Sequence, residues 1–307
     1  ARWILAKAGN KKPLKRLWIS SVTDKAIRDG FAHLKNAEEY ENLYHAATAR
    51  AESDWLVGIN ATRALTCKYN AQLSCGRVQT PTLAMIAARE EEIRHFTPKP
   101  YYGLQLTGKG ITFTWKDKKS GSSATFSKEK NEEIYKKLSG KTAVVAEVKK
   151  TKKTSQPEGL YDLTDLSRDA NQRFGFSAKQ TLNIMQSLYE HHKVLTYPRT
   201  DSRYLTNDMT DTLKDRIKAC QNGSYKKAAA ALLRKDIKAS SRFINDKKVS
   251  DHHAIIPTEQ YASLTSFSSD ERKIYDMVVA RFLAVLSAPA VSEQLSVKAN
   301  VNGELFR

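Results

Sequence analysis

The spacing of apolar residues changes along the chain, and this change most limits the folds that the sequence can adopt. Between residues 101 and 148 apolar and polar residues alternate, as in Ile111-Thr-Phe-Thr-Trp115, and the alternation returns between residues 291 and 306. A period of two indicates β-strands, whereas residues 160–286 have the longer period of amphipathic helices. These helices include one at residues 177–191, with Ser177 as its expected N-cap, and a basic one at residues 224–240. We therefore predict an α+β, multidomain protein in which a helical block is inserted between strands of one β-rich domain.

Helical sequence also precedes the first expected strand. Residues 1–34 have the pattern helix, strand, helix, with Thr23 as the expected N-cap of the second helix. Residues 38–66 have the apolar spacing of one long helix, and another helix is expected from Thr80, with Pro81 in its first helical position. The expected parts are residues 1–34, a helical part at 35–98, a β-rich part at 99–159 and 288–307, and a helical part at 160–287.

Basic residues outnumber acidic ones by a wide margin. Lys and Arg total 51 and Asp and Glu total 33, which gives a net charge of +18. Such an excess predicts an acidic polymer as partner, most often nucleic acid. The charge alone leaves open a ribosome-like scaffold protein or simple solubility. The lysine run from Lys149 to Lys153 likewise indicates either a solvated linker or an edge that contacts phosphate groups.

The three cysteines, Cys67, Cys75 and Cys220, are not spaced as metal ligands or as a disulfide framework. We therefore expect no metal site in this chain, and reduced thiols are typical of the cytoplasm. No apolar run approaches the roughly 20 residues that span a bilayer, so no membrane segment is expected. The sequence opens within an expected helix and stops within an expected strand, which indicates part of a longer polypeptide.

A tyrosine, an arginine and an acid lie close together in the segment Leu195-Thr-Tyr-Pro-Arg-Thr-Asp-Ser202. Pro198 biases Tyr197 away from helical geometry, so this ring should stand on a stiff, extended turn after a helix. A phenol ionises only near pH 10, and a guanidinium such as that of Arg199 can hold a phosphate while charge builds on its oxygens. These residue types suit phosphoryl transfer with Tyr197 as nucleophile, although a Tyr-Pro pair by itself is more often an ordinary buried tyrosine.

Two adjacent histidines, His252 and His253, precede the apolar segment Ala254-Ile-Ile-Pro257. The apolar segment should hold the backbone against a core and leave one ring free to donate to a phosphate or to transfer a proton. Metal binding by the pair is not expected, because adjacent side chains on an extended segment point apart. A purely structural role stays open for both histidines.

A third candidate lies where Gly76-Arg-Val-Gln-Thr-Pro81 leads into a helix. A helix N-terminus beside an arginine favours an anion, but a capped helix with a solvent-facing Arg77 explains the same residues equally well. Arg50 and Asp54 lie one helical turn apart, which a surface ion pair would also explain.

Four ordered motifs cover about 200 residues of the chain. They are Ala-Arg-Ala-Glu-Ser-Asp-Trp-Leu-Val-Gly (49–58), Ser-Cys-Gly-Arg-Val-Gln-Thr-Pro (74–81), Leu-Thr-Tyr-Pro-Arg-Thr-Asp-Ser (195–202) and Asp-His-His-Ala-Ile-Ile-Pro-Thr (251–258). With these motifs the chain resembles the bacterial type IA DNA topoisomerases, most closely the topoisomerase III group. The resemblance implies the type IA topoisomerase core, in which the tyrosine-bearing helical domain is inserted in a β-rich hinge domain.

The resemblance also implies a role for each matching residue. Tyr197 would become joined to the 5′ phosphate of the cut strand, Arg199 would stabilise that phosphate, and His252 would assist. The residues implied to contact DNA are Arg50, Asp54, Arg77, Gln79, Thr200, Asp201 and Ser202. The implied partner is DNA, chiefly single-stranded segments, with duplex passed through a central hole by a monomer associated with the bacterial nucleoid in the cytoplasm.

In this family Mg²⁺ is bound by acidic residues of a Toprim domain. Residues 1–34 would be only the tail of that domain, so the Mg²⁺ ligands are absent from this sequence. We therefore expect this chain alone to be unable to relax supercoiled DNA. No Gly-rich phosphate-binding loop is present either, which predicts a reaction without ATP.

Two other functions compete with this one. A non-catalytic module that binds single-stranded DNA would explain the positive charge without using Tyr197. A tyrosine recombinase is disfavoured, because its chemistry needs several dispersed Arg, His and Lys residues near the tyrosine, and the motif order here does not resemble it.

Overall fold

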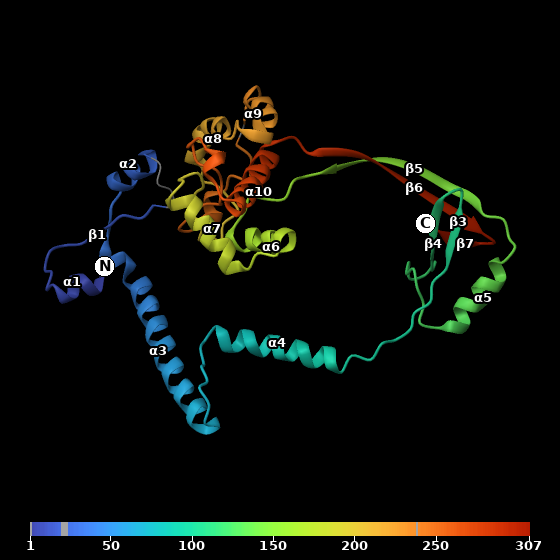
Figure 1. Ribbon diagram of the computed structural model, residues 1–307, viewed down its shortest axis with the longest axis horizontal. Coiled ribbons are helices and arrows are strands. Elements are labelled where there is room, and N and C mark those ends of the chain that lie inside the picture. Colours follow the sequence, from blue (N-terminus) through green and yellow to red (C-terminus); the bar gives the residue numbers. More distant parts are fainter. Residues whose placement is uncertain (1, 20–23, 238) are drawn as a thin grey trace. The chain divides into compact units, whose positions relative to one another are not determined.

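The computed structural model describes residues 2–19, 24–237 and 239–307. Thr23, the expected N-cap, lies outside the described residues. The chain forms two compact units, the first made of Ala1–Glu39 and Thr154–Val291 and the second of Tyr40–Lys153 and Ser292–Arg307. The second unit thus contains residues from both sides of the helical block in the first (Figure 1).

Short elements at the start of the first unit follow the expected order of helix, strand and helix. They are α1 (Arg2–Lys7), β1 (Lys15–Arg16), α2 (Asp24–Ala32), β2 (Lys35–Asn36) and η1 (Ala37–Tyr40). β1 and β2 pair antiparallel, with Lys15 opposite Asn36. The Nζ of Lys15 donates to the Oδ1 of Asn36 at 2.6 Å, and the guanidinium of Arg2 donates to the carbonyl of Ala37 at 2.8 Å.

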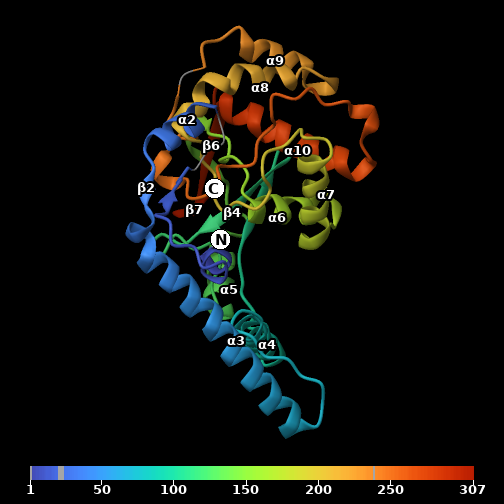
Figure 2. The same ribbon diagram turned by 90° about the vertical axis from the view of Figure 1, so that its left-hand side faces the viewer.

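The rest of the first unit is a helical bundle (Figures 1 and 2). Its helices are α6 (Leu163–Phe174), α7 (Ala178–Glu190), η2 (Asn207–Thr212), α8 (Leu213–Ala219), η3 (Gly223–Tyr225), α9 (Lys226–Leu233), η4 (Asp246–Lys248), η5 (Leu264–Ser266) and α10 (Ser269–Leu286). Ser177 caps α7 as predicted, and Ser268 forms a capping box with Glu271 at the start of α10. The predicted basic helix over residues 224–240 is shorter than expected, since α9 ends at Leu233.

The bundle has the main hydrophobic core of the chain. Leu166, Met185, Leu188, Leu213 and Phe282, among others, are almost fully buried on facing helices. Because burial of each large apolar side chain contributes roughly 1.5–3 kcal/mol, this core can hold the loops between α7, α8 and α10 in fixed positions. Those loops bear the residues that the sequence singled out.

The second unit begins with two long helices, α3 (Glu41–Tyr69) and α4 (Gln79–Arg94). Both were predicted, but the expectation that Thr80 caps α4 was wrong. The helix begins at Gln79 after Val78, and the Thr80 hydroxyl instead accepts the N–H of Gly76 at 3.0 Å. The loop between the helices is attached to α3, because the Thr62 hydroxyl accepts the N–H of Cys75 at 2.9 Å.

A five-stranded sheet follows in the order β3-β4-β7-β6-β5. Its strands are β3 (Gln105–Gly108), β4 (Ile111–Lys116), β5 (Val144–Ser155), β6 (Ala290–Val301) and β7 (Glu304–Phe306). The prediction that the C-terminal alternating segment rejoins the earlier strands is confirmed, since Trp115 on β4 lies opposite Phe306 on β7. A helical block between strands of one sheet is the predicted α+β arrangement.

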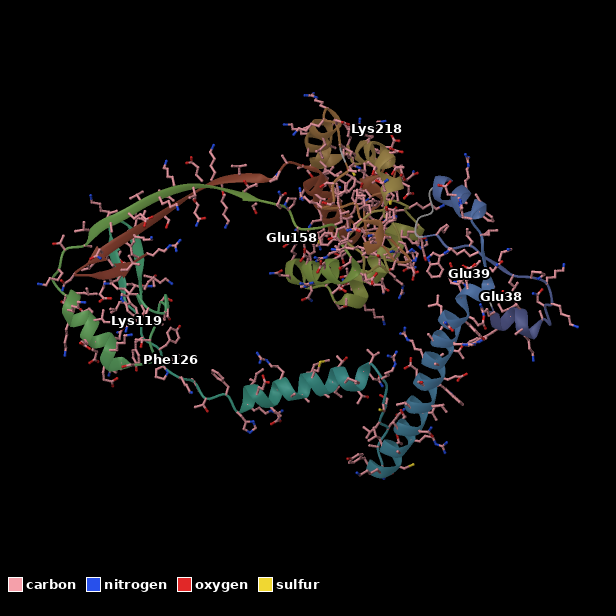
Figure 3. All side chains as sticks on the ribbon, turned by 180° about the vertical axis from the view of Figure 1, so that it is seen from behind. Glu38, Glu39, Lys119, Phe126, Glu158 and Lys218 are labelled. Atoms are coloured by element: carbon pink, nitrogen blue, oxygen red, sulfur yellow. The ribbon has the colours of Figure 1, made fainter. Side chains whose placement is uncertain are left out.

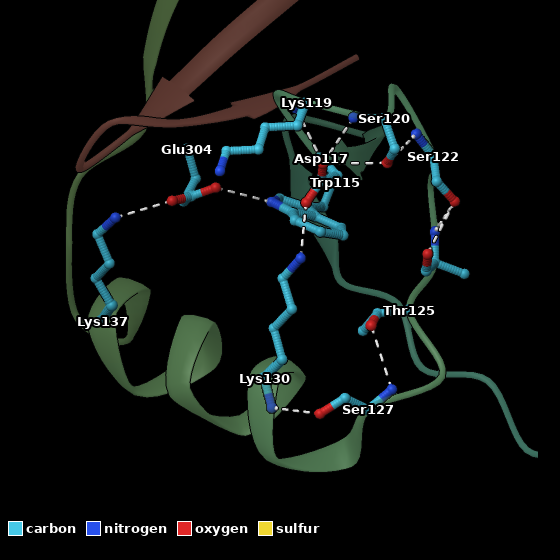
Figure 4. A network of polar contacts seen from close by, with 11 residues as sticks. Trp115, Asp117, Lys119, Ser120, Ser122, Thr125, Ser127, Lys130, Lys137 and Glu304 are labelled. Carbon is cyan, nitrogen blue, oxygen red and sulfur yellow. Dashed lines mark hydrogen bonds and ion pairs between the residues drawn. The ribbon is translucent and has the colours of Figure 1, made fainter.

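Polar contacts attach a further helix, α5 (Lys128–Leu138), to this sheet (Figure 4). The indole N–H of the buried Trp115 donates to Glu304 at 3.0 Å, and Glu304 also pairs with Lys137 of α5 at 2.8 Å. Asp117 accepts from Lys130 of α5 and from the N–H groups of the turn after β4, and these donors hold the pKa of its carboxyl far below the ordinary value. The sequence analysis missed α5, although Ser127 is a suitable N-cap.

Candidate active site

Two of the four motifs lie side by side in the first unit, although about 60 residues separate them in sequence. Leu195 pairs with Pro257 in an antiparallel bridge. The N–H of Thr196 donates to the carbonyl of Ile256, and the N–H of Thr258 donates to that of Val194, each at 3.0 Å. This backbone pairing brings the tyrosine segment and the histidine segment together.

Tyr197 stands on this paired segment just after α7, in the non-helical conformation that Pro198 favours. Its ring lies against the His252 ring, with centroids 4.3 Å apart and an interplanar angle of 39°. Tyr189 of α7 supports it edge-on, with centroids 5.5 Å apart. The residue is only half-buried, and its hydroxyl makes no hydrogen bond to any described residue. The ring is therefore positioned by packing while its oxygen is left unpaired within the described chain.

The two adjacent histidines differ sharply in their surroundings. His252 is exposed and lies against Tyr197. His253 points elsewhere and donates from its Nδ1 to the carbonyl of Ala254 at 2.8 Å. Burial lowers the pKa of His253 to about 4, and the charge of Arg216 acts in the same direction. His253 is thus a neutral structural residue near pH 7, and only His252 is available to the tyrosine.

Thr200 and Ser202 attach the tyrosine segment to residues 248–252 through buried side chains. The Thr200 hydroxyl donates to the carbonyl of His252 at 2.9 Å, and that of Ser202 donates to the carbonyl of Lys248 at 2.8 Å. The Thr200 hydroxyl therefore positions the His252 backbone and the Ser202 hydroxyl positions the Lys248 backbone, and neither side chain faces solvent. Asp201, between them, is exposed and accepts from the Ser250 hydroxyl at 3.5 Å.

Arg199 is exposed, and its guanidinium makes no hydrogen bond or ion pair with any residue in the described ranges. A guanidinium without a carboxylate partner keeps all five donors for an incoming anion.

Arg216 of α8 supports the histidine segment from beneath, a role that sequence reasoning missed. It is buried, donates to the carbonyl of Pro257 at 2.9 Å and pairs with Glu259 at 2.7 Å. Burial lowers the pKa of its guanidinium, and the Glu259 carboxylate opposes this effect. Nothing in the local sequence of α8 marks this arginine, because its partners come from a segment about 40 residues away.

A second missed cluster lies at the start of the bundle. Arg281 of α10 stacks on the Tyr161 ring at 4.2 Å and pairs with Asp169 at 2.9 Å. The Tyr161 hydroxyl donates to Asp169, and burial together with this acceptor raises the pKa of the phenol to about 12. The carbonyl of Tyr161 accepts the N–H of Ile255, so the cluster also holds the histidine segment in place.

The partial burial of His253 predicts a pH dependence of folding. An unfolded histidine titrates near pH 6.5, so below that pH the unfolded chain binds a proton that the folded chain accepts only near pH 4. The free energy of unfolding should therefore fall as pH decreases from about 6.5 to about 4, by about 2–3 kcal/mol from this residue. Urea unfolding at pH 7 and pH 4.5 should show a smaller decrease for His253→Gln than for the unsubstituted chain.

The matched control for this measurement is His95→Gln. His95 lies on the surface just after α4, and its replacement should leave the pH dependence unchanged. An identical decrease in all three proteins would show that His253 is not held neutral by burial.

The other residues expected to contact DNA lie in the second unit. The Arg77 guanidinium holds Asp54 through both carboxylate oxygens, which lowers the pKa of Asp54 and raises that of Arg77. The alternative of a surface ion pair between Arg50 and Asp54 is not what the structure contains, because Asp54 pairs with Arg77 and the Arg50 charge acts on it only at longer range. The side-chain amide of Gln79 donates to the Ser74 hydroxyl at 3.2 Å.

Neither site assembles the ligands that a divalent cation needs. Within residues 2–19, 24–237 and 239–307, no three His, Cys, Asp or Glu side chains gather in a way that could hold a metal ion. Mg²⁺ prefers several oxygen ligands in octahedral geometry. The residues present in the described ranges do not fit that ion.

The fold is that of a topoisomerase. The structure resembles full-length topoisomerase I from Thermotoga maritima with a TM-score of 0.69 and 25% sequence identity, over 99% of this chain and 50% of that protein. A family model described as DNA topoisomerase matches residues 38–307, so the chain belongs to the DNA topoisomerase family.

The similar curated proteins are more specific about the branch of the family. The chain is 59% identical over 306 residues to the DNA topoisomerase 3 of Bacillus licheniformis and 58% identical to that of Bacillus subtilis. The predicted resemblance to the topoisomerase III group is thereby confirmed. All of this chain is matched, but it spans 42% of the length of each relative.

Proposed function

We propose that this chain cleaves and rejoins single strands of DNA through a phosphotyrosine at Tyr197, as part of a type IA topoisomerase. The observation that carries the proposal is the Tyr197 ring held against His252 on a proline-stiffened segment, with its hydroxyl unpaired. An ordinary core tyrosine at this position would instead have its hydroxyl buried against a partner.

The reaction is an exchange of one phosphate ester for another. The Tyr197 oxygen attacks a backbone phosphorus, a phenolic P–O bond forms, and the P–O3′ bond of the upstream nucleotide breaks. The phenol proton leaves with attack, and the departing 3′ oxygen gains a proton and becomes a hydroxyl. Rejoining reverses these steps, so no nucleotide is consumed, in keeping with the proposed independence from ATP.

Arg199 and His252 have separate roles in this exchange. Arg199, exposed and without a partner in the described chain, donates to the non-bridging oxygens as their charge grows. His252, against the tyrosine ring, donates to the same phosphate or transfers a proton. Thr200 acts on His252 indirectly, because its hydroxyl fixes the His252 carbonyl.

The motif residues of each unit are proposed to contact DNA. In the second unit these are Arg50, Arg77 and Gln79, with Asp54 orienting Arg77 through their ion pair. Asp201 adds an exposed contact near Tyr197, whereas Thr200 and Ser202 support the site through backbone bonds. Contacts to phosphate rather than to base edges would give little sequence preference.

Several proposals concern the whole protein rather than this chain. They are an Mg²⁺ requirement met by residues outside this sequence, passage of a duplex, action as a monomer, and a cytoplasmic location at the nucleoid. No helix in the described part of the chain is long and apolar enough to cross a lipid bilayer.

The direction of the covalent link provides a sharp test. A polypeptide of the relatives' length that contains this sequence is incubated with a single-stranded oligonucleotide and stopped with denaturant. If Tyr197 takes the 5′ phosphate, a label at the 3′ end should stay with the protein, and a label at the 5′ end should be released on a shorter strand. Retention of the 5′ label would contradict the proposal, and binding without any adduct would favour a non-catalytic single-strand-binding module.

A further inference from the structure

The lysine run that the sequence left ambiguous lies in a regular strand rather than in a linker. Lys149, Lys150, Lys152 and Lys153 all belong to β5, which is exposed along its whole length. β5 pairs with β6. The Thr151 hydroxyl of β5 also donates to the carbonyl of Gln294 of β6, at 3.5 Å. We call residues 147–153 and 292–298 of these strands the basic ribbon.

Within the described residues, both faces of the ribbon are exposed along β5 and along residues 292–295 of β6, and only residues 296–298 are half-buried. Side chains project from both sides of β5 and β6 in Figure 3. Because successive residues of a strand point to opposite faces, Lys149 and Lys153 lie on one face and Lys150 and Lys152 on the other. Positive charge on both faces is not what a strand that packs against a protein core would carry.

Little of this charge is neutralised locally. The ribbon contains five lysines and two glutamates. Glu147 is held by Lys298, and Glu293 lies 3.8 Å from Lys150 with both side chains largely exposed. An exposed pair at this distance is weak, so the Lys150 ammonium can exchange the carboxylate for a phosphate. Lys149, Lys152 and Lys153 make no ion pair with a described residue.

The composition of the ribbon also indicates which form of nucleic acid it fits. Neither of its two segments contains Phe, Tyr, Trp or His. Surfaces that hold single strands combine positive charge with aromatic rings on which bases stack. A surface with charge alone suits phosphates whose bases are already paired, and a two-stranded ribbon is narrow enough for the major groove of a duplex.

We propose that the basic ribbon of β5 and β6 is a contact surface for the phosphate backbone of duplex DNA, separate from the residues that hold the strand at Tyr197. The proposal rests on the function proposed above only in its choice of DNA as the polymer. A competing explanation is that edge lysines merely prevent strands from aggregating, which would involve no ligand.

Salt dependence of binding separates these explanations. The chain with Lys149, Lys150, Lys152 and Lys153 all changed to Gln is compared with the unsubstituted chain for binding to a 20-base-pair duplex, by fluorescence anisotropy across a series of salt concentrations. Each phosphate contact contributes about 0.9 to the slope of log K against log salt. We expect the magnitude of the slope to fall by about 2–4, and the slope for an unpaired oligonucleotide to change by less than about 1.

Matched controls keep the test independent of folding and of total charge. Changing Lys109, Lys118, Lys136 and Lys141 to Gln removes the same charge from exposed positions of the same unit. This control variant should keep most of the salt dependence of duplex binding. Changing the four ribbon lysines to Arg keeps the charge and should leave the salt dependence of duplex binding unchanged. An unchanged duplex slope in the Gln ribbon variant, an equal fall in the control variant, or an equal fall for single strands would each overturn the proposal.

Failure of this proposal and failure of the proposed function give different results. In a polypeptide of the relatives' length, the ribbon variant should still form the Tyr197 adduct with single-stranded DNA at low salt. Tyr197→Phe should form no adduct and should retain the salt dependence of duplex binding. Loss of the slope with the adduct intact therefore supports the ribbon contact, whereas an adduct absent from the unsubstituted protein would count against the phosphotyrosine alone.

Discussion

Replacement of Tyr197 by Phe should abolish the covalent adduct between the protein and single-stranded DNA. The substitution removes the attacking oxygen and leaves the ring that packs against His252 and Tyr189. Loss of a nucleophile typically costs at least about 10⁴-fold in rate. The measurement is the yield of labelled DNA that remains with the denatured protein, in a polypeptide of the relatives' length.

Binding and folding provide the controls for this substitution. Because the Tyr197 hydroxyl has no partner in the described chain, its removal should change the free energy of unfolding by less than about 0.5 kcal/mol. Affinity for single-stranded DNA should stay within about twofold. Tyr189→Phe keeps the edge-on packing and should retain the adduct. An undiminished adduct in Tyr197→Phe would remove the nucleophile assignment.

Replacement of Arg199 by Ala should slow adduct formation by about 10²–10³-fold, which corresponds to about 3–4 kcal/mol of transition-state stabilisation. The expected cause is the loss of a cation that donates to the phosphate oxygens as their charge grows. Arg199→Lys keeps the charge but loses the two-pronged geometry of the guanidinium, so an intermediate rate is expected. Single-turnover cleavage of a saturating oligonucleotide measures this step apart from binding.

A structural role for Arg199 would give a different pattern. Arg199 is exposed and pairs with no described residue, so its replacement should not alter thermal stability. Arg173→Ala, an exposed arginine in the last turn of α6, is a matched control and should cleave at the normal rate. Equal cleavage by Arg199→Ala and the unsubstituted protein would exclude the proposed contact with phosphate.

The periodic features of the sequence predicted most of the helices and strands. Alternation identified the β-rich segments, including the C-terminal one that rejoins the sheet through β6 and β7. Caps such as Ser177 marked helix starts, because side-chain hydroxyls there satisfy free N–H groups. α5 was missed because its Lys- and Glu-rich sequence presents few apolar residues, and it attaches to the sheet through ion pairs such as Lys137–Glu304.

The motifs singled out His252 and His253 but could not determine their environments. His253 is neutral because its neighbours exclude water from it, and His252 lies against Tyr197 because backbone bonds join residues 194–196 to residues 256–258. Both effects depend on residues far away in sequence, as do the contacts of Arg216 and Arg281. The Arg77–Asp54 pair likewise required the loop before α4 to fold back along α3.

The sequence by itself determined the type of most long elements, the excess of positive charge, and the motifs that identify a DNA topoisomerase. These properties depend on residues close together in the chain, whose spacing controls which side chains share a face. Only the tertiary structure decided which histidine meets Tyr197, which hydroxyls hold that histidine in place, and that the lysine run is an exposed strand. Packing and backbone pairing between distant segments make those choices, and no local pattern contains them.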